Sequence, residues 1–275
     1  MSSLEFGAQA PSFAVKAGGD VEIALRLMTP APETGGVPYG VWRTGVAWID
    51  AANAVFDSTS NGVVVPELIT LNDILVTGPS TYTFTGTGSF VGAGTFVLGG
   101  GGGVLWNGPT LTQQPIVITN GVFTLGVDAP AAALGGPGSP ITVAANGTFD
   151  LNAAFVNADV KNEITHQKKF IIEGEGFNGQ GALVNNGSVD NWNSAFRNIT
   201  LTGDATIGGS KRFDVRALAN TASTEPLGVF GKGKTLTVKT TPSSFAVIAG
   251  AIDVEKVVIK DGGVFRPEGA CTFTI

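Results

Sequence analysis

The chain has 275 residues, of which 43% are hydrophobic and only 14% are charged, with 40 glycines and a net charge of −6. This length and apolar content suffice for a sizeable core, and sparse charge with abundant glycine predicts a β-rich, turn-dense protein. The acidic balance argues against a nucleic-acid partner, because phosphate neutralisation needs clustered Lys and Arg. A single cysteine, Cys271, excludes an internal disulfide framework, and a single histidine, His166, argues against Cys/His metal sites, so no cofactor is expected.

Residues 1–40 are predicted to form an N-terminal arm or cap, and residues 41–275 a β-solenoid. Val21–Met28 alternates as one strand would, with a short helix as the alternative, and the proline- and glycine-rich stretch Thr29–Pro38 predicts a loop or linker. Met1–Gln9 lacks the basic and apolar regions of a secretory signal. No stretch approaches the roughly 20 apolar residues of a membrane helix, so we expect no membrane insertion.

From Val63 onward, short runs alternate between apolar and polar residues, and glycines separate the runs. This pattern is typical of short strands with one buried face, joined at corners. Residues 197–216 are the best-formed unit, and Gly203 and Gly208–Ser210 divide it into three expected strands. Their apolar pairs are Ile199/Leu201, Ala205/Ile207 and Phe213/Val215.

An internal repeat supports this interpretation. Val117–Leu125 aligns with Val143–Leu151, each being a strand, Asn-Gly and a strand, and Val257–Phe265 is a third relative. Asn-Gly is also a strong hairpin signal, but repeats built from strands alone favour stacked coils. The five glycines Gly99–Gly103 predict a tight corner or a closely packed backbone, since neither Lys-Ser/Thr nor a helical pattern follows them.

Three segments resemble the autotransporter-associated β-solenoid repeats of bacterial surface proteins: residues 198–216, Ser139–Asn152 and Gly174–Gly187. The entry to such regions is similar to residues 54–60 and 69–74, so the resemblance covers about 41–268. It implies a right-handed parallel β-solenoid in a structural or adhesive surface protein, and no catalytic residues to carry over. Such passengers normally have a signal peptide and a C-terminal membrane barrel, and neither is recognised here. By analogy, a virus particle is the favoured setting.

Because β-solenoids also host glycan-cleaving enzymes, charged residues on strand faces are candidates for catalysis. Three groups qualify: Glu173 with Glu175, Asp214 with Arg216, and Lys256 and Lys260 with Asp253 and Asp261. The glycines beside Glu173 and Glu175 indicate a solvated corner rather than a catalytic pair. Asp214 and Arg216 are expected to form an exposed ion pair. His166 is expected in an exposed loop. We therefore predict no enzyme activity.

Three tryptophans are candidates for contact with a glycan or a partner: Trp42, Trp48 and Trp192. Trp42 and Trp48 would share one face of an extended segment, where plugging the first coil is the favoured role and stacking on a glycan is the alternative. Trp192 lies in a second loop, Asn185–Asn193.

The favoured function is a non-catalytic structural protein that assembles on a particle or cell surface, with a phage capsid-surface, decoration or tail protein as the leading case. The alternatives are an adhesin or glycan binder, and a β-helix lyase or hydrolase. We expect homo-oligomers or docking to a larger protein shell, because weakly charged flanks suit such contacts. The expected location is a virion surface or the cell exterior.

Overall fold

The computed structural model describes residues 39–41, 52–57, 62–127, 129, 133–135, 138–152, 168–217, 225–268 and 272–273. The side chains of 39–41, 52, 191–195 and 272–273 lie outside this description. Of the predicted arm, only Tyr39 and Gly40 are included, and with Val41 they form strand β1, which pairs with β2. The division into an arm and a body therefore stays a prediction.

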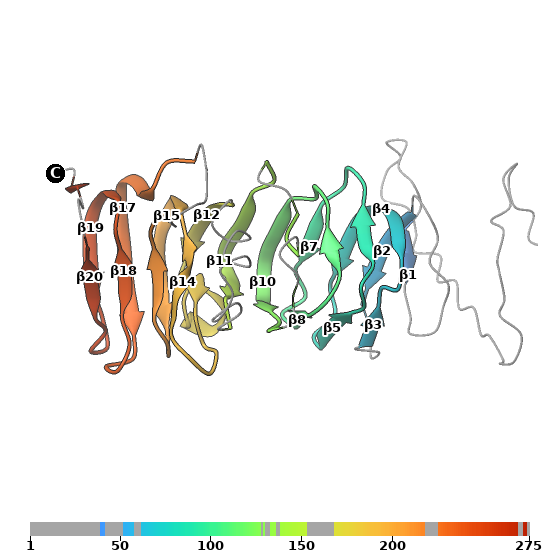
Figure 1. Ribbon diagram of the computed structural model, residues 1–275, viewed down its shortest axis with the longest axis horizontal. Coiled ribbons are helices and arrows are strands. Elements are labelled where there is room, and N and C mark those ends of the chain that lie inside the picture. Colours follow the sequence, from blue (N-terminus) through green and yellow to red (C-terminus); the bar gives the residue numbers. More distant parts are fainter. Residues whose placement is uncertain are drawn as a thin grey trace, which may run out of the picture.

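The described chain is all-β, with one short 3-10 turn, η1 (Phe177–Gly179), as its single helical element. All strand pairings among these residues are parallel. Seventeen strands form one hydrogen-bonded sheet and four form a second. Figure 1 shows the strands side by side along the long axis, advancing in chain order from blue to red. This arrangement is consistent with a β-helix.

One column of strands, called the first stack, runs through the whole described chain. It contains β1 (Tyr39–Val41), β2 (Ala52–Phe56), β4 (Leu68–Val76), β7 (Phe96–Leu98), β10 (Ile116–Leu125), β11 (Ile141–Asp150), β12 (Lys169–Gly174), β15 (Asn198–Gly209), β17 (Gly228–Thr240), β19 (Ala251–Ile259) and β21 (Thr272–Phe273). The chain from one residue of this stack to its paired residue on the next strand is called a rung. Rungs differ in length: the rung from Phe96 to Ile116 is much shorter than the rung from Ile199 to Val229.

A second stack lies beside the first. It contains β3 (Gly62–Val64), β5 (Thr81–Thr85), β8 (Gly103–Trp106) and β13 (Leu183–Val184), together with the C-terminal halves of β10, β11, β15, β17 and β19. Shorter columns complete the fold: β6 (Ser89–Val91) and β9 (Thr110–Leu111) beside the start of β4, and the four-stranded sheet of β14 (Asn191–Phe196), β16 (Phe213–Val215), β18 (Ala246–Ile248) and β20 (Phe265–Pro267).

The core is a line of aromatic rings that follows the stacks. Phe84 stacks on Trp106 with ring centroids 4.8 Å apart, Trp106 on Phe123 at 6.0 Å, and Phe123 on Phe149 at 5.8 Å. Each of these rings has less than 2% of its surface exposed. Phe84 pairs in register with Trp106, and Phe123 with Phe149, so the inward side chain of one strand meets the inward side chain of the next. Trp106 contacts Phe123 diagonally, because Trp106 is in register with Leu125 and Phe123 with Val104.

The predicted repeat is confirmed in its Asn-Gly half. Asn120 pairs with Asn146 and Gly121 with Gly147, as the alignment predicts, within parallel strands rather than in a hairpin turn. The preceding residues pair at a slightly shorter offset, because a bulge lies between Ile118 and Asn120. The third relative is wrong: Asp261 and Gly262 lie in a turn after β19, beyond the second stack.

The glycine predictions have mixed outcomes. The run Gly99–Gly103 is closely packed, as expected: a Cβ on Gly100 would overlap the carbonyl of Thr77 in the preceding rung. Gly203 was expected to separate two strands, and this is wrong, because β15 continues through it with a register shift between Thr200 and Ala205. Across that shift the hydroxyl of Thr202 donates to the carbonyl of Ile172 in one neighbouring rung, and Asp204 accepts from the backbone N–H of Thr235 in the other.

Candidate functional site

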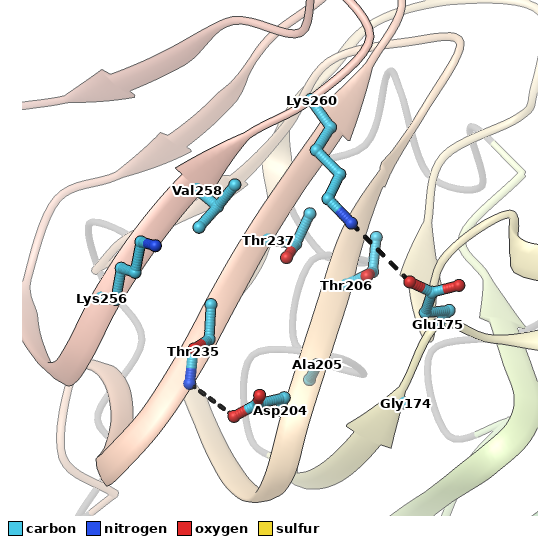
Figure 2. Close-up of a pocket in the computed structure, with 10 residues that line it drawn as sticks. All are labelled: Gly174, Glu175, Asp204, Ala205, Thr206, Thr235, Thr237, Lys256, Val258 and Lys260. Atoms are coloured by element: carbon cyan, nitrogen blue, oxygen red, sulfur yellow. Dashed lines mark hydrogen bonds and ion pairs between the residues drawn. The ribbon is translucent and has the colours of Figure 1, made fainter.

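A shallow groove of about 350 Å³ crosses the outer side of the second stack in the later rungs. It is lined by Gly174, Glu175, Asp204, Ala205, Thr206, Thr235, Thr237, Lys256, Val258 and Lys260. Thr206, Thr237 and Val258 are in register on β15, β17 and β19. The residue before each of them packs in or against the core, so alternation along the strands places these three outside (Figure 2).

Two interactions organise the charges of this groove. The Nζ of Lys260 lies 3.8 Å from Oε1 of Glu175, and the backbone N–H of Thr235 donates to Oδ1 of Asp204 at 2.8 Å (Figure 2). Lys256 reaches the same groove from β19. The groove therefore offers hydroxyl groups, carboxylates and ammonium groups on one open surface, a mixture that suits hydrogen bonding to a polar ligand.

The predicted carboxylate pair does not share a site. Glu173 lies in β12, and its Oε2 accepts a hydrogen bond from Oγ1 of Thr202 at 3.2 Å. Gly174 has a φ of 81°, which breaks the strand alternation, and Glu175 lies past the end of β12 with 73% of its side chain exposed. The prediction of a solvated corner is confirmed for Glu175, whereas Glu173 lies within the strand and is partly exposed.

The predicted exposed ion pair of Asp214 and Arg216 is wrong in its exposure. The Asp214 side chain is completely buried, between Arg212 (Nε to Oδ1, 2.7 Å; Nη2 to Oδ2, 2.8 Å) and Arg216 (Nε to Oδ2, 2.6 Å). Both arginines directly flank β16, the strand that carries Asp214, and the Arg212 guanidinium lies 4.8 Å from the ring centre of Phe245, which directly precedes β18. Burial raises the pKa of the Asp214 carboxyl, and the hydrogen bonds and charge of Arg212 and the charge of Arg216 oppose that shift.

The predicted group of two lysines and two aspartates is also wrong. Lys256 and Lys260 share the groove with Asp204 and Glu175 instead. Asp261 forms an ion pair with Lys239 at 3.4 Å, and Asp253 pairs in register with Phe230 in the first stack. The turn after β19 carries Asp261 away from the groove, which residue spacing alone could not show.

The tryptophan predictions fall mostly outside the described residues. Trp42, Trp48 and His166 lie outside them. The expected loop position of Trp192 is wrong, because Trp192 lies in strand β14, and its side chain is outside the description. Contact of Trp42, Trp48 or Trp192 with a glycan or partner therefore stays a prediction. Trp106 is buried in the core, and its Nε1 donates to the carbonyl of Pro109 at 2.8 Å.

A feature missed in the sequence is an apolar line on the outer side of the first stack, which we call the outer row. It consists of Val55, Leu75, Val97, Val117, Thr142, Ile171, Thr200 and Phe230. Each member pairs in register with the next, each is partly exposed, and each directly follows a buried residue of its own strand. In the sequence, alternation within each strand indicates one outward apolar residue. Only the register between strands shows that these residues form a continuous line.

The described residues contain no group of three or more His, Cys, Asp or Glu side chains placed to hold a metal ion. In the same part of the chain, no helix has the length and apolar character that a membrane span requires. Comparisons with protein-family models, curated proteins and solved structures found no match. The resemblance to autotransporter-associated repeats therefore stays a prediction.

Proposed function

We propose that this chain is a right-handed parallel β-solenoid and a non-catalytic structural component that assembles on a particle or cell surface. Parallel strands that recur in order, with each rung pairing to the next, support a coil, and parallel β-crossover connections are overwhelmingly right-handed. A virion capsid-surface, decoration or tail protein is the leading case. The resemblance noted in the sequence supports a surface protein, and the virion setting rests on analogy.

The observation that carries this proposal is the outer row. A partly exposed line of Val, Leu, Ile, Thr and Phe runs along eight strands of one stack. Contiguous apolar surface on the outside of a folded protein marks interaction sites more often than chance, because water solvates it poorly. A rod-like stack with such a line along its side suits lateral attachment in an assembly.

Localisation on intact assemblies tests the proposal. Antibodies raised against the purified chain should label the surface of intact virus particles or cells of the source organism in immunogold electron microscopy. Matched preparations that lack the gene serve as the control. Labelling confined to soluble extracts, with bare particles and cells, would overturn the proposal.

The groove favours a second candidate function, a glycan-binding surface protein. The hydroxyl of Thr237, the ammonium of Lys256 and the carboxylate of Asp204 line one open surface that could pair with sugar hydroxyls, and the buried Thr206 lies beneath it. A glycan array probed with the native chain and with Lys256→Ala and Trp192→Ala variants tests this function. Binding that both substitutions leave unchanged would remove these residues from it.

A further inference from the structure

The outer row has the length of an interface. With strands about 4.8 Å apart, its eight members extend over roughly 34 Å. They lie outside the buried core cluster, and each keeps part of its surface exposed in the part of the chain that the structure describes. From Val55 to Val117 all members of the row are aliphatic.

The repeat of the row restricts what can pack against it. Side chains of two facing sheets meet all along a contact when both sheets carry one side chain per strand at the same spacing. A second copy of this chain meets that condition by construction. A charged partner has little to bind along the first half of the row, because residues 62–127 contain just two charged side chains, Glu67 and Asp73.

Charges beside the row are self-complementary. On β12, every second side chain points outward: these are Lys169, Ile171 and Glu173. The intervening residues, Phe170 and Ile172, are buried. A two-fold axis parallel to the stack places each rung opposite the same rung of a second copy and reverses the strand direction. Lys169 then faces the second copy's Glu173, and Glu173 faces the second copy's Lys169.

The same operation avoids charge conflicts elsewhere along the row. Asp73 would face the second copy's Thr77, which is uncharged and follows β4. Beyond Phe230, the next residue in register is Asp253, and it would face Asp253 of the second copy. Like charges placed opposite each other are destabilising, so the contact ends at Phe230.

We propose that two copies of this chain pack side by side through the outer row, related by a two-fold axis parallel to the stack. This inference rests on the proposed assembly function and identifies its partner as a second copy. Three outward positions per strand give a width of about 13 Å, hence about 450 Å² of flat area per copy. Because a standard interface buries about 800 Å² per partner, the dimer is weak and depends on concentration.

Sedimentation velocity from about 5 to about 500 μM tests the pairing. The native chain should shift from monomer to dimer across this range. Val97→Lys with Val117→Lys should weaken the dimer at least tenfold, since it buries unpaired charge in the contact. Thr83→Lys with Thr124→Lys, on the outer side of the second stack in nearby rungs, is the matched control and should dimerise like the native chain. Far-ultraviolet circular dichroism verifies that both variants are folded.

A charge exchange tests the symmetry. Lys169→Glu alone should weaken the dimer, because it opposes two carboxylates, and adding Glu173→Lys should restore it. Failure of the double exchange to restore the dimer overturns the two-fold arrangement, and a native chain that stays monomeric throughout overturns the pairing. Surface labelling with a monomeric chain would contradict this inference alone, and a dimer without surface labelling would contradict the proposed function alone.

Discussion

The N-terminal region, residues 62–127, and the C-terminal region, residues 168–217 and 225–268, build the same parallel stack with different chemistry. The first contains two charged residues and packs Tyr82, Phe84, Phe90, Phe96, Trp106 and Phe123 into its core. The second buries charged groups, with Asp214 held between Arg212 and Arg216 and Lys168 just 1% exposed. Both regions therefore keep their strands in register. Aromatic side chains fill the core of the first region, whereas the second region also buries charged side chains.

Rung length accompanies this difference. The rung from Phe96 to Ile116 is short, whereas the rung from Phe170 to Ile199 is about half as long again. A short rung leaves little chain outside the strands, so nearly every residue is either a core position or a corner. A longer rung carries extra segments, such as η1, and their polar groups need partners when they are covered.

The largest expected effect is loss of aromatic stacking in the N-terminal region. Trp106→Ala should lower the free energy of unfolding by about 3–5 kcal/mol, because it opens a cavity beside Phe84 and Phe123. Urea unfolding followed by circular dichroism measures the loss. Trp106→Phe, which keeps a ring and removes the hydrogen bond to Pro109, should cost about 1 kcal/mol.

The position of this loss sharpens the comparison. Because each rung contacts mainly its neighbours, Trp106→Ala should reduce amide hydrogen-exchange protection in β5, β8 and β10 and leave β17 and β19 protected. Equal loss in both regions would show that the stack unfolds as one cooperative unit.

The next effect comes from the ionic network of the C-terminal region. Asp214→Asn should cost about 3 kcal/mol, because it leaves two guanidinium groups without their buried carboxylate. Asp190→Asn is the control: exposed Asp190 accepts a hydrogen bond from the backbone N–H of Arg212. It should cost less than about 1 kcal/mol. Equal costs for the two variants would contradict a special role for the buried carboxylate.

A smaller effect should depend on pH. Burial lowers the pKa of Lys168 to about 8 from 10.5, and its Nζ donates to the carbonyl of Ser139 at 3.1 Å. Between these two values the unfolded chain keeps a proton that the folded chain has lost, so stability rises with pH. Lys168 should therefore raise the free energy of unfolding by about 1.4 kcal/mol between pH 7 and pH 9.

Unfolding measured at both pH values in native and variant chains isolates this contribution. Lys168→Met should abolish the rise, whereas Lys232→Met, at an exposed position, should keep it. A rise that persists in Lys168→Met would assign it to another group.

The smallest effect is expected for the exposed pair of Lys260 and Glu175, whose nitrogen and oxygen lie 3.8 Å apart. A double-mutant cycle with Lys260→Ala and Glu175→Ala should give a coupling below about 0.5 kcal/mol, and salt should reduce it further. A coupling as large as that of the Arg212–Asp214 pair would remove the contrast between open and covered charges within the C-terminal region.

Local patterns in the sequence determined much of the fold. Alternation predicted strands, glycines predicted corners and close approaches, and the match of Asn120-Gly121 to Asn146-Gly147 predicted stacked strands at the right offset. These features depend on the backbone freedom of single residues and on the two-residue period of a strand, both of which are local properties.

The tertiary structure alone decided which rungs lie together. Rung length varies along the chain, so the sequence could not reveal that Val97 continues the line of Leu75, or that Lys260 lies beside Glu175. It could not reveal the burial of Asp214 either: Arg212 and Arg216 flank the same strand, but Val247, which pairs with Asp214 in register, and Phe245, which lies against Arg212, belong to the next rung. Register between distant segments results from hydrogen bonds and packing over the whole stack, and it places both the groove and the outer row.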